Sequence, residues 1–383
     1  MKKSFVFLLI VGCVVFFLTQ IIGWSCSVSG AGNNFVTDNI PVTDSIKLVF
    51  VGDVMGHGNQ IKGAWRDGGD SCYNYAPGFE GMKDYISSAD LAIANLEVTF
   101  AGEPYTGYPA FSSPHSMAVA LQDMGIDMLV TANNHMMDRG RKGLESTIDV
   151  LDSLGIPHTG TFKDSVAWKA GHPLIMEKNN FRLAFLNYTY GTNMAMAKLP
   201  NRINYTDTVR IAADLAKARA LNPDYIITYI HWGEEYHHKE NATQRRLAAF
   251  LAKNGCNLIV GAHPHVVQPI VKIPGNAIDS VGSVDSVLVA YSLGNFISNQ
   301  RWRYSDGGIA LEVTLTRTEG VVSLLSHNYE PFWVHRYPEK NVQVYRIIPV
   351  NTYLSNPERY SISDENKKLM MQFYNDTKDI IKQ

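Results

Sequence analysis

Short, continuously apolar segments that end in polar residues recur along most of this chain, and this pattern constrains its fold more than any other feature. An apolar run without alternation is typical of a strand that is covered on both faces. Helical patterns lie between several runs, and the clearest are Gly140–Leu154, which ends at Gly155-Ile156-Pro157, and Gln244–Lys253. The expected strands are Ile46–Val51, Leu91–Leu96, Met128–Ala132, Leu183–Leu186, Tyr225–Ile230, Leu258–Val260 and Ser286–Tyr291.

This alternation of strands and helices predicts a layered α/β fold. Ile309–Leu315 and Val321–Ser326 are expected to pair antiparallel across a turn at Thr318-Glu319-Gly320, which makes the sheets mixed and flanked by helices. With 383 residues, 45% of them hydrophobic, the chain can bury a large core. Its formal net charge of -2 gives no electrostatic basis for a nucleic-acid partner, or for an acidic polymer held by bulk attraction.

The N-terminus has the order of a targeting segment. Lys2 and Lys3 precede an apolar run from Phe5 to Ile22, which fits either an uncleaved signal anchor or a signal peptide. In the second case Cys26, after Ser25, is the expected lipid acceptor of a lipoprotein, and we favour this alternative. The basic flank should stay in the cytoplasm, so residues 1–26 would place the folded domain outside it, at the cell membrane or envelope.

The rest of the chain divides into three parts. Residues 27–45 are rich in Ser, Gly, Asn and Thr and are expected to be a flexible tether. Residues 46–350 form the predicted globular domain, and 351–383 a C-terminal tail with a helix over Asp364–Ile381. Cys72 and Cys256 are the cysteines of the folded part. We expect two unpaired, partly buried thiols, although an oxidising compartment would permit a disulfide.

Side chains that can bind metals follow the ends of the expected strands, at the edge where open α/β sheets bind ligands. Carboxylate, amide and imidazole groups suit divalent Zn, Mn, Fe or Mg, and a carboxylate shared by two ions lets both polarise one water and one substrate oxygen. The sequence therefore predicts a site for two divalent metal ions. The side chains are Asp53, Glu97, Asn134, His135, His231, His263 and His265.

Each of these residues also has a purely structural interpretation. Asp53 after Gly52 is equally typical of a turn or a helix N-cap, and Glu97 of a solvated strand end. The Asn133-Asn134-His135 segment fits a turn, with Asp138 capping the following helix. His231 alone would more often be a structural histidine. Only the pair in Gly261-Ala262-His263-Pro264-His265 favours metal binding by itself, so the case depends on the joint occurrence.

Together these segments resemble the capsule-synthesis protein family CapA (PgsA), whose domain is similar to the calcineurin-like metallophosphoesterases. The resemblance covers Ile46 to about Phe296, roughly two-thirds of the chain. The stretches that carry it are Val51-Gly52-Asp53-Val54-Met55, Asn95-Leu96-Glu97, Asn133-Asn134-His135 with Asp138 and Gly140, His231-Trp232-Gly233-Glu234-Glu235-Tyr236, Gly261-Ala262-His263-Pro264-His265 with Gln268-Pro269, and Tyr291-Ser292-Leu293-Gly294-Asn295-Phe296.

The resemblance implies a role for each site residue. Asp53 and His265 would bind the first metal, Asn134, His231 and His263 the second, and Glu97 would bridge them. His135 would be the outer acid or anion stabiliser. Typical phosphoesterases begin with Asp-any-His, whereas Asp53 is followed here by Val54 and Met55. This departure concerns catalysis more than the fold, and His57 is near enough in sequence to substitute. Asn295 is either a further site residue or a turn-former.

The family implies the synthesis, export or anchoring of poly-γ-glutamate or a related anionic polymer. Our leading hypothesis is a membrane-tethered, metal-dependent hydrolase that acts on an anionic surface polymer or its lipid-linked precursor, within a capsule-synthesis membrane complex. The alternative is a polymer-binding or export accessory without turnover. A secreted nucleotidase or phosphodiesterase is a third hypothesis. It would need an aromatic clamp, to which Trp232, Tyr236, Trp302 and Tyr304 could contribute.

Overall fold

The computed structural model describes residues 44–194, 196–198, 200–275 and 286–382, within one compact unit that spans Val42–Gln383. The predicted targeting segment with Cys26, and the predicted tether up to residue 43, lie outside the described residues. Among the helices that the structure describes, none combines the length and the apolar character needed to cross a membrane.

The first sheet has eight strands and is mixed. Its central strands run parallel, whereas the strands that continue it on one side are antiparallel. A short additional strand, β13 (Asn295–Ile297), pairs in parallel with the end of β1. The order across the sheet is β16 (Val342–Pro349), β15 (Val321–Glu339), β14 (Gly307–Thr318), β1 (Asp44–Val54), β2 (Leu91–Leu96), β3 (Met128–Val130) and β4 (His158–Thr159).

The second sheet has six strands, four of them parallel in its centre. Its two edge strands are antiparallel to their neighbours. The order is β11 (Ile270–Pro274), β12 (Ser286–Ala290), β10 (Leu258–Ala262), β9 (Tyr225–His231), β7 (Phe181–Thr189) and β6 (Leu174–Lys178). A separate pair consists of β5 (Thr161–Phe162) and β8 (Arg202–Ile203).

The two sheets stack face to face around the main core. Because successive side chains of a strand point to opposite faces, the apolar run of β1 supplies two different cores. Leu48 and Phe50 pack between the sheets, whereas Val49 and Val51 pack against the helices on the outer face. A direct link crosses the sandwich, since the hydroxyl of Tyr229 in β9 donates to the carbonyl of Val51 in β1 at 2.8 Å.

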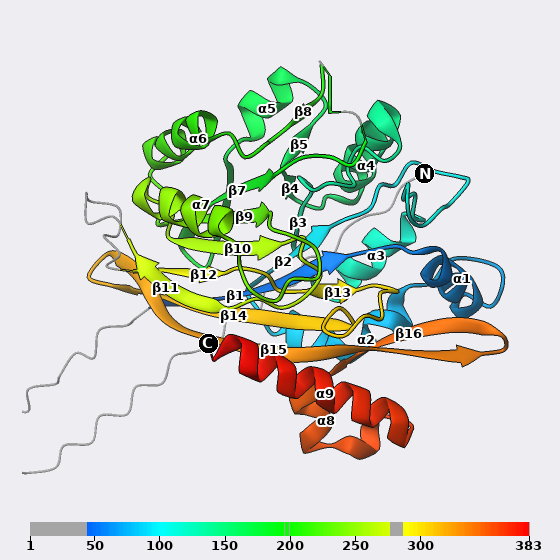
Figure 1. Ribbon diagram of the computed structural model, residues 1–383. Helices are drawn as coiled ribbons and strands as arrows, with labels where there is room; N and C mark the ends of the chain where they lie inside the picture. The colour runs from blue at the N-terminus through cyan, green and yellow to red at the C-terminus, as the bar shows by residue number, and fades with distance from the viewer. Residues whose placement is uncertain (1–43, 195, 199, 276–285, 383) are drawn as a thin grey trace, which may run out of the picture. The chain divides into compact units, whose positions relative to one another are not determined.

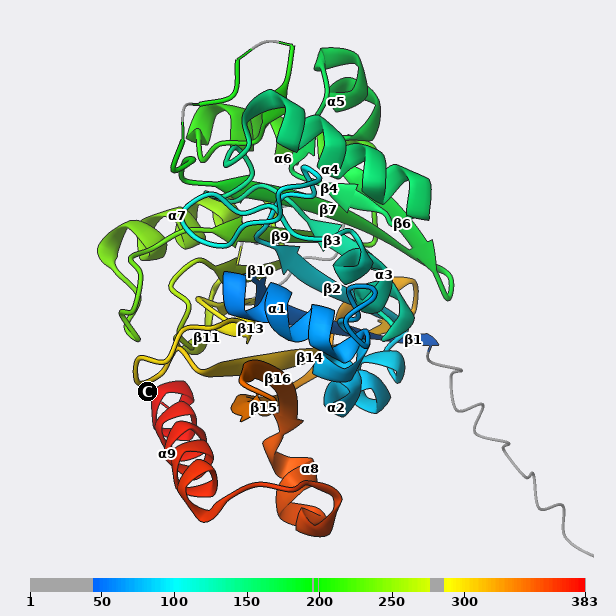
Figure 2. The same cartoon turned by 90° about the vertical axis from the view of Figure 1, so that its right-hand side faces the viewer.

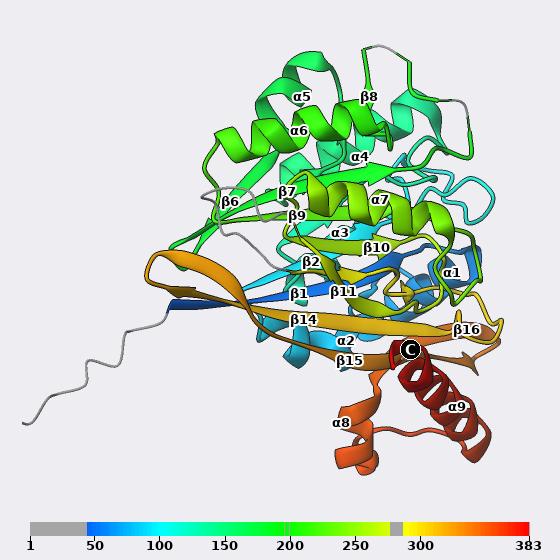
Figure 3. The same cartoon turned by 60° about the vertical axis from the view of Figure 1, so that its left-hand side comes forward.

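Helices cover the outer faces of both sheets (Figures 1 and 2). The outer face of the first sheet packs against α1 (Gly58–Asp67), α2 (Ala76–Ser87) and α3 (Ser116–Asp123), with α4 (Gly140–Leu154) beside α3 at the edge. The outer face of the second sheet packs against α6 (Thr208–Ala220) and α7 (Ala242–Lys253), as Figure 3 shows. The short helix α5 (Ser165–Gly171) adjoins β5.

The C-terminal part completes the first sheet. The helix α9 (Asp364–Ile381) lies along β15 (Figure 3), and its Met370, Phe373 and Ile380 join the core between the sheets. The short helices α8 (Val350–Ser355) and η1 (Pro357–Arg359) connect it to β16. The predicted tail helix is therefore present at its expected bounds and packs on the domain.

The predicted α/β fold with mixed sheets flanked by helices is confirmed. The expected strand Leu91–Leu96 and helix Gly140–Leu154 have the predicted bounds. The helix stops at Gly155, whose φ of 66° is a left-handed conformation that glycine adopts without strain. Strand β1 begins at Asp44, two residues before the expected start, and β7 continues through Asn187 to Thr189. The thiols of Cys72 and Cys256 are unpaired, the first exposed and the second buried.

Candidate metal centre

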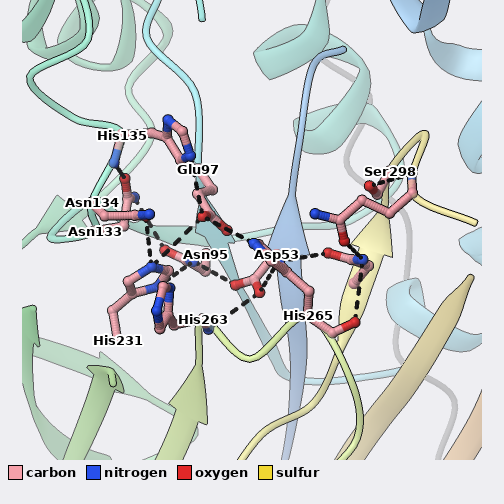
Figure 4. A network of polar contacts seen from close by, with 12 residues as sticks. Asp53, Asn95, Glu97, Asn133, Asn134, His135, His231, His263, His265 and Ser298 are labelled. Atoms are coloured by element: carbon pink, nitrogen blue, oxygen red, sulfur yellow. Dashed lines mark hydrogen bonds and ion pairs between the residues drawn. The ribbon is translucent and has the colours of Figure 1, made fainter. Parts of the chain in front are cut away.

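The predicted metal-binding side chains meet where strands of both sheets end (Figure 4). Asp53 lies one residue before the end of β1, and Glu97 directly follows β2. From the second sheet, His231 is the last residue of β9, and the turn with His263 and His265 follows β10. Asn134 and His135 come from the turn after β3. Each of these side chains is buried, and His263 has the largest exposed fraction, 4%.

Glu97 is at the centre of this cluster. Its Oε1 lies 3.6 Å from His231 Nε2, 3.8 Å from His265 Nε2 and 4.0 Å from His135 Nε2. Two overlapping groups, each with its ligand atoms within 4.8 Å of one another, share Glu97: one adds His263 and His265, and the other adds Asp53 and His231. A carboxylate common to two groups of ligands is what a bridging role requires. These groups place His263 with His265, whereas the resemblance implied different metals for them.

The chemistry of the cluster fits a divalent cation. Both carboxylate oxygens of Glu97 and Nδ1 of His263 are buried without a hydrogen-bond partner among the described residues. A buried polar atom without a partner carries a cost of roughly 1–3 kcal/mol, and the neighbouring Asp53 carboxylate adds repulsion. A cation among these atoms would satisfy them and would neutralise both carboxylates. The residues present therefore fit a metal ion.

The pKa values in the cluster shift in the directions that burial dictates. Burial, and then the Asp53 carboxylate, raise the pKa of Glu97 well above its usual range. Burial and the neighbouring imidazoles lower the pKa of His231 well below its usual range, and burial with His265 lowers that of His263 to about 3. Both histidines are therefore neutral at physiological pH, which is the state in which imidazole binds a metal.

Two asparagines for which the sequence predicted no role, Asn95 and Asn133, orient side chains of the cluster. Asn95 Nδ2 donates to Asp53 Oδ1 at 2.7 Å and lies 3.3 Å from His231 Nδ1. Asn133 Nδ2 donates to the Leu96 carbonyl at 2.7 Å, and its Oδ1 accepts the His135 amide at 3.1 Å. These side chains come from the same strand ends as the ligands. Their position beside the predicted ligands was visible in the sequence, but their partners depend on the strand register.

Asn134 and His231 are paired directly. His231 Nε2 lies 2.9 Å from Asn134 Oδ1, so the two predicted ligand atoms already converge. The ring of Tyr190, which follows β7, stacks on His231 with an interplanar angle of 8° and lies 4.6 Å from the ring of His263. Tyr190 was not predicted, because no motif marks an aromatic residue that covers two imidazoles.

The turn that carries the histidine pair is strained and tightly packed. His263 and His265 have φ values of 96° and 59°, which non-glycine residues rarely adopt and which cost about 1–3 kcal/mol each. The Asp53 Oδ2 atom holds the turn, since it accepts the His263 amide at 3.2 Å and lies 3.1 Å from His265 Nδ1. A Cβ atom at Gly261 would lie 2.0 Å from the carbonyl oxygen of Tyr291, so only glycine fits there.

The two additional residues named from the sequence have different surroundings. Asn295 Oδ1 lies 3.0 Å from His265 Nδ1, and Asn295 Nδ2 donates to Gln300 and to the Ser305 carbonyl, so this residue orients a ligand. His57 is the N-cap residue of α1, with Nδ1 3.1 Å from Gln60 Oε1. Burial lowers its pKa to about 4. It belongs to neither of the two groups of ligands.

His135 forms a buried pair with Asp138. The two side chains are joined by an Nδ1–Oδ2 contact of 2.7 Å, and His135 Nε2 faces Glu97. The same carboxylate oxygen also accepts the Phe111 amide at 2.8 Å. The interpretation of Asp138 as a helix cap is wrong, because the N-cap position of α4 is Arg139 and has no side-chain cap. Asp138 binds the histidine instead.

A cavity of about 610 Å³ adjoins the cluster and includes Met55, His57, His135 and His265 in its wall. Its rim contains the exposed aromatic side chains of Tyr108 and Trp302, with exposed fractions of 72% and 60%. Among the described residues, no lysine or arginine lines it, and Glu235 is its acidic group. The cavity therefore offers aromatic surface rather than positive charge beside the metal-binding residues.

Two of the four proposed clamp aromatics lie at this cavity. The rings of Tyr236 and Trp302 are 4.9 Å apart and tilted by 52°, so they contact each other and leave no gap for a nucleobase between them. Trp232 is buried against Tyr291, and Tyr304 packs against His238 outside this cavity. The four residues do not form the clamp that a nucleotidase would need.

The model of the family "Bacterial capsule synthesis protein PGA_cap" matches residues 47–300, about two-thirds of the chain, and the matched stretch contains every candidate ligand described above. This chain belongs to the PGA_cap family. The predicted family is thereby confirmed, and with it a capsule-related function.

Two curated relatives agree with membership of the PGA_cap family. "Capsule biosynthesis protein CapA" of Bacillus anthracis is 24% identical over 350 residues, which cover 87% of this chain and 74% of that protein. "PGA biosynthesis protein CapA" of Bacillus subtilis is 28% identical over 268 residues, which cover 68% of this chain and 65% of that protein. This PGA_cap chain thus spans slightly less than two-thirds of the B. subtilis relative.

Solved structures of low similarity were also found. The calcineurin-like phosphoesterase YfkN of Bacillus subtilis is 13% identical, with a TM-score of 0.46 over 89% of this chain and 100% of that chain. A phosphatase from Mycoplasma pneumoniae is 14% identical, with a TM-score of 0.40 over 82% and 99%. Because the similarity is so low, we assign the α/β sandwich fold of this PGA_cap protein from its own strand topology and not from these structures.

Proposed function

We propose that this chain is a membrane-tethered, metal-dependent hydrolase of capsule assembly. One observation carries the proposal: Glu97 is fully buried at the meeting point of both sheets, and neither of its carboxylate oxygens has a hydrogen-bond partner in the part of the chain that the structure describes. Three imidazole nitrogens lie within 4.0 Å of one of those oxygens. A folded protein that needed no cation there would be more stable with an apolar residue at this position.

The proposed site holds two divalent ions, of Mn, Zn, Fe or Mg. Glu97 would be shared between them, and the other ligands would be Asp53, Asn134, His231, His263 and His265. When bound, such ions lower the pKa of a water molecule and polarise a substrate oxygen. The protein keeps these candidate ligands buried, so the electrostatic interactions within the site are stronger than in water.

His135 is the residue that would handle a proton. Asp138 fixes its Nδ1, so Nε2 is directed to the cluster and also lines the adjoining cavity. A protonated Nε2 would stabilise negative charge that develops on a substrate oxygen, or would protonate a leaving group. The bond broken would be a phosphoester or a γ-glutamyl amide, since both develop charge on an oxygen during hydrolysis.

The proposed substrate is an anionic surface polymer, such as poly-γ-glutamate, or its lipid-linked precursor. The names of the two CapA relatives support a polymer of the capsule. The apolar N-terminal run after Lys2 and Lys3 supports a tether in the membrane, with Cys26 as lipid acceptor or as part of the flank of a signal anchor. Partners in a capsule-synthesis membrane complex are proposed on the same basis.

Elemental analysis and turnover assays of the full chain test this proposal together. We expect bound divalent metal and hydrolysis of bis(p-nitrophenyl) phosphate or of tri-γ-glutamate. The Glu97→Gln variant should lose metal and turnover, because a neutral amide cannot bridge two cations. Glu234→Gln is the matched control, since Glu234 is exposed and lies outside both ligand groups. Absence of metal and of turnover in the wild-type protein would reject the catalytic proposal.

A second candidate is a polymer-binding or export accessory on the same fold. Met55, at the position of the histidine in typical phosphoesterases, is buried and lines the cavity, so no imidazole occupies that place. This function predicts that Asp53→Ala and His263→Ala cells still display capsule polymer, as measured by surface staining, while the purified variants lack metal. Loss of the polymer in both variants, with normal protein levels, contradicts the accessory function.

A further inference from the structure

A second, smaller cavity of about 280 Å³ lies between α9 and the end of the first sheet, and it shares no lining residue with the metal-side cavity. Three arginines line it: Arg301 and Arg303 from the segment after β13, and Arg336 from β15. All three follow residue 300, where the match to the family model ends. This arginine cavity is therefore a feature outside the metal centre.

Arg301 is incompletely satisfied. Its Nη1 donates to the Val334 carbonyl at 2.7 Å, but its Nε and Nη2 atoms are buried and have no acceptor among the residues that the structure describes. Burial, followed by repulsion from Arg336, lowers the pKa of Arg301 to about 10, so the side chain still carries its charge at neutral pH. A buried guanidinium with two unused donors is strongly stabilised by an acceptor that carries negative charge.

The acidic residues of the cavity compensate for this charge only in part, because Asp306 attracts Arg301 electrostatically and raises its pKa without bonding to it. Asp376 is bound by Arg303 through two hydrogen bonds of 2.9 and 2.8 Å. Asp306 accepts the indole N–H of Trp333 at 2.7 Å, and it forms no ion pair with an arginine within the described part of the chain. Each carboxylate of the cavity thus already has another partner.

Arg336 also lacks an acidic partner within the described ranges of the chain. Its Nη1 donates to the amide oxygen of Asn299 at 3.1 Å, which is a neutral acceptor. Over the described residues, neither Arg301 nor Arg336 forms an ion pair with a carboxylate. Arg301 and Arg336 repel each other in one cavity, and among the described residues no carboxylate forms an ion pair with either, which favours the binding of an anion.

We propose that this cavity binds a carboxylate or phosphate group of a ligand through Arg301 and Arg336. The planar guanidinium fork matches the two oxygens of either group, which a lysine would not do as specifically. Leu369 and Phe373 of α9 line the same cavity and offer apolar surface to the rest of the ligand. The anion site stands on these arginines alone and does not require a metal at the other cavity.

The segment between the two cavities contributes residues to both. Asn299, Gln300 and Trp302 line the metal-side cavity, whereas Arg301 and Arg303 line the arginine cavity. Asn299 connects them further, because its amide oxygen accepts from Arg336 and its backbone N–H donates to His57 Nδ1 at 3.4 Å. A ligand anion at Arg336 would therefore lie next to the wall of the cavity beside the metal centre.

Isothermal titration calorimetry on the metal-free full chain tests the anion site. The protein is treated with EDTA and dialysed, so that phosphate cannot bind a metal and no chelator competes for the arginines. Inorganic phosphate and tri-γ-glutamate are titrated separately, because they represent the two sources of the anionic group. We expect saturable binding of at least one of them, and the tighter one identifies a phosphate-bearing or a carboxylate-bearing ligand.

Two variants assign the binding to this cavity. Arg301→Gln and Arg336→Gln should each weaken the affinity at least about tenfold, because each removes a charged hydrogen-bond donor. Arg141→Gln is the matched control, since Arg141 is an exposed arginine on α4 that pairs with Glu145. If Arg301→Gln lowers the melting temperature so far that it cannot be titrated, Arg336→Gln decides.

Three results would overturn the proposal. These are no binding of either probe to the metal-free wild-type protein, equal affinity in Arg336→Gln and wild type, and an equal loss in the Arg141→Gln control. Failure of the proposed hydrolase is distinguishable from these results, because the titration is done without metal and measures no turnover.

Discussion

Protonation of His263 should destabilise the metal-free protein in mild acid. Burial lowers the pKa of this histidine from 6.5 to about 3, and its Nδ1 has no hydrogen-bond partner among the described residues that a variant would lose. Below the pKa that His263 has in the unfolded chain, this histidine binds a proton in the unfolded state but remains neutral in the folded state. Stability is therefore lost as the pH falls from the unfolded value towards the folded one.

The size of this effect follows from the two pKa values. One pKa unit corresponds to about 1.4 kcal/mol, so the full contribution of His263 across the interval between 6.5 and about 3 is about 5 kcal/mol. Between about pH 7 and about pH 5 the same relation gives a loss of about 2 kcal/mol. Replacement by glutamine, which does not titrate, should remove this loss.

Urea unfolding of the EDTA-treated full chain, followed by tryptophan fluorescence at several pH values, measures the effect. The difference in unfolding free energy between wild type and His263→Gln should change by about 2 kcal/mol over that pH range. Loss of packing against Tyr190 lowers the unfolding free energy of the variant by the same amount at every pH. The informative quantity is therefore the slope of the unfolding free energy against pH. His115→Gln is the control, because His115 is exposed. Parallel pH profiles for wild type and His263→Gln would refute the reasoning.

Three further variants test separate features of the centre. Asp138→Asn should lower kcat about tenfold to hundredfold at unchanged metal content, because the carboxylate that fixes His135 is lost; unchanged kcat on bis(p-nitrophenyl) phosphate contradicts this. Trp302→Ala should raise KM roughly fivefold to tenfold without a change in melting temperature, since the side chain is exposed at the cavity rim. An unchanged KM would show that Trp302 does not contact the substrate. Gly261→Ala should destabilise the fold by about 2–4 kcal/mol in urea unfolding, whereas Gly58→Ala, which has open space, should not; equal stabilities would show that the turn can move.

The elements with buried apolar runs could be predicted from the sequence, because burial on both faces leaves a continuous pattern. Leu91–Leu96 has the expected bounds for this reason, whereas Asp364–Ile381 could be predicted as a helix that buries only one face, with Met370, Phe373 and Ile380. Where a polar residue lies inside a strand, the prediction stopped too early. Asn187 is inside β7, where its Oδ1 accepts the amides of Thr131 and Ala132, and a sequence does not show such a partner.

The ligand cluster was predicted by the same logic, since strand ends of a parallel sheet meet at one edge. The residues that orient the candidate ligands were not predicted, because their contacts depend on strand register and on packing between the sheets. Asn95 precedes Glu97 by two residues and still could not be assigned, since its partner Asp53 lies on the adjacent strand. Tyr190 and Asp138 are similar cases: their contacts with His231 and His135 arise from loop conformations that carry no pattern.

The placement of the ligands on both sheets has a mechanical consequence. Asp53 and Glu97 belong to one sheet, and His231 and His263 to the other, so an ion bound by all four is a non-covalent cross-link through the sandwich. An ion present at about a hundred times its dissociation constant would add about 2.7 kcal/mol of stability. The concentration of divalent ions would then determine the resistance of the protein to proteolysis as well as its activity.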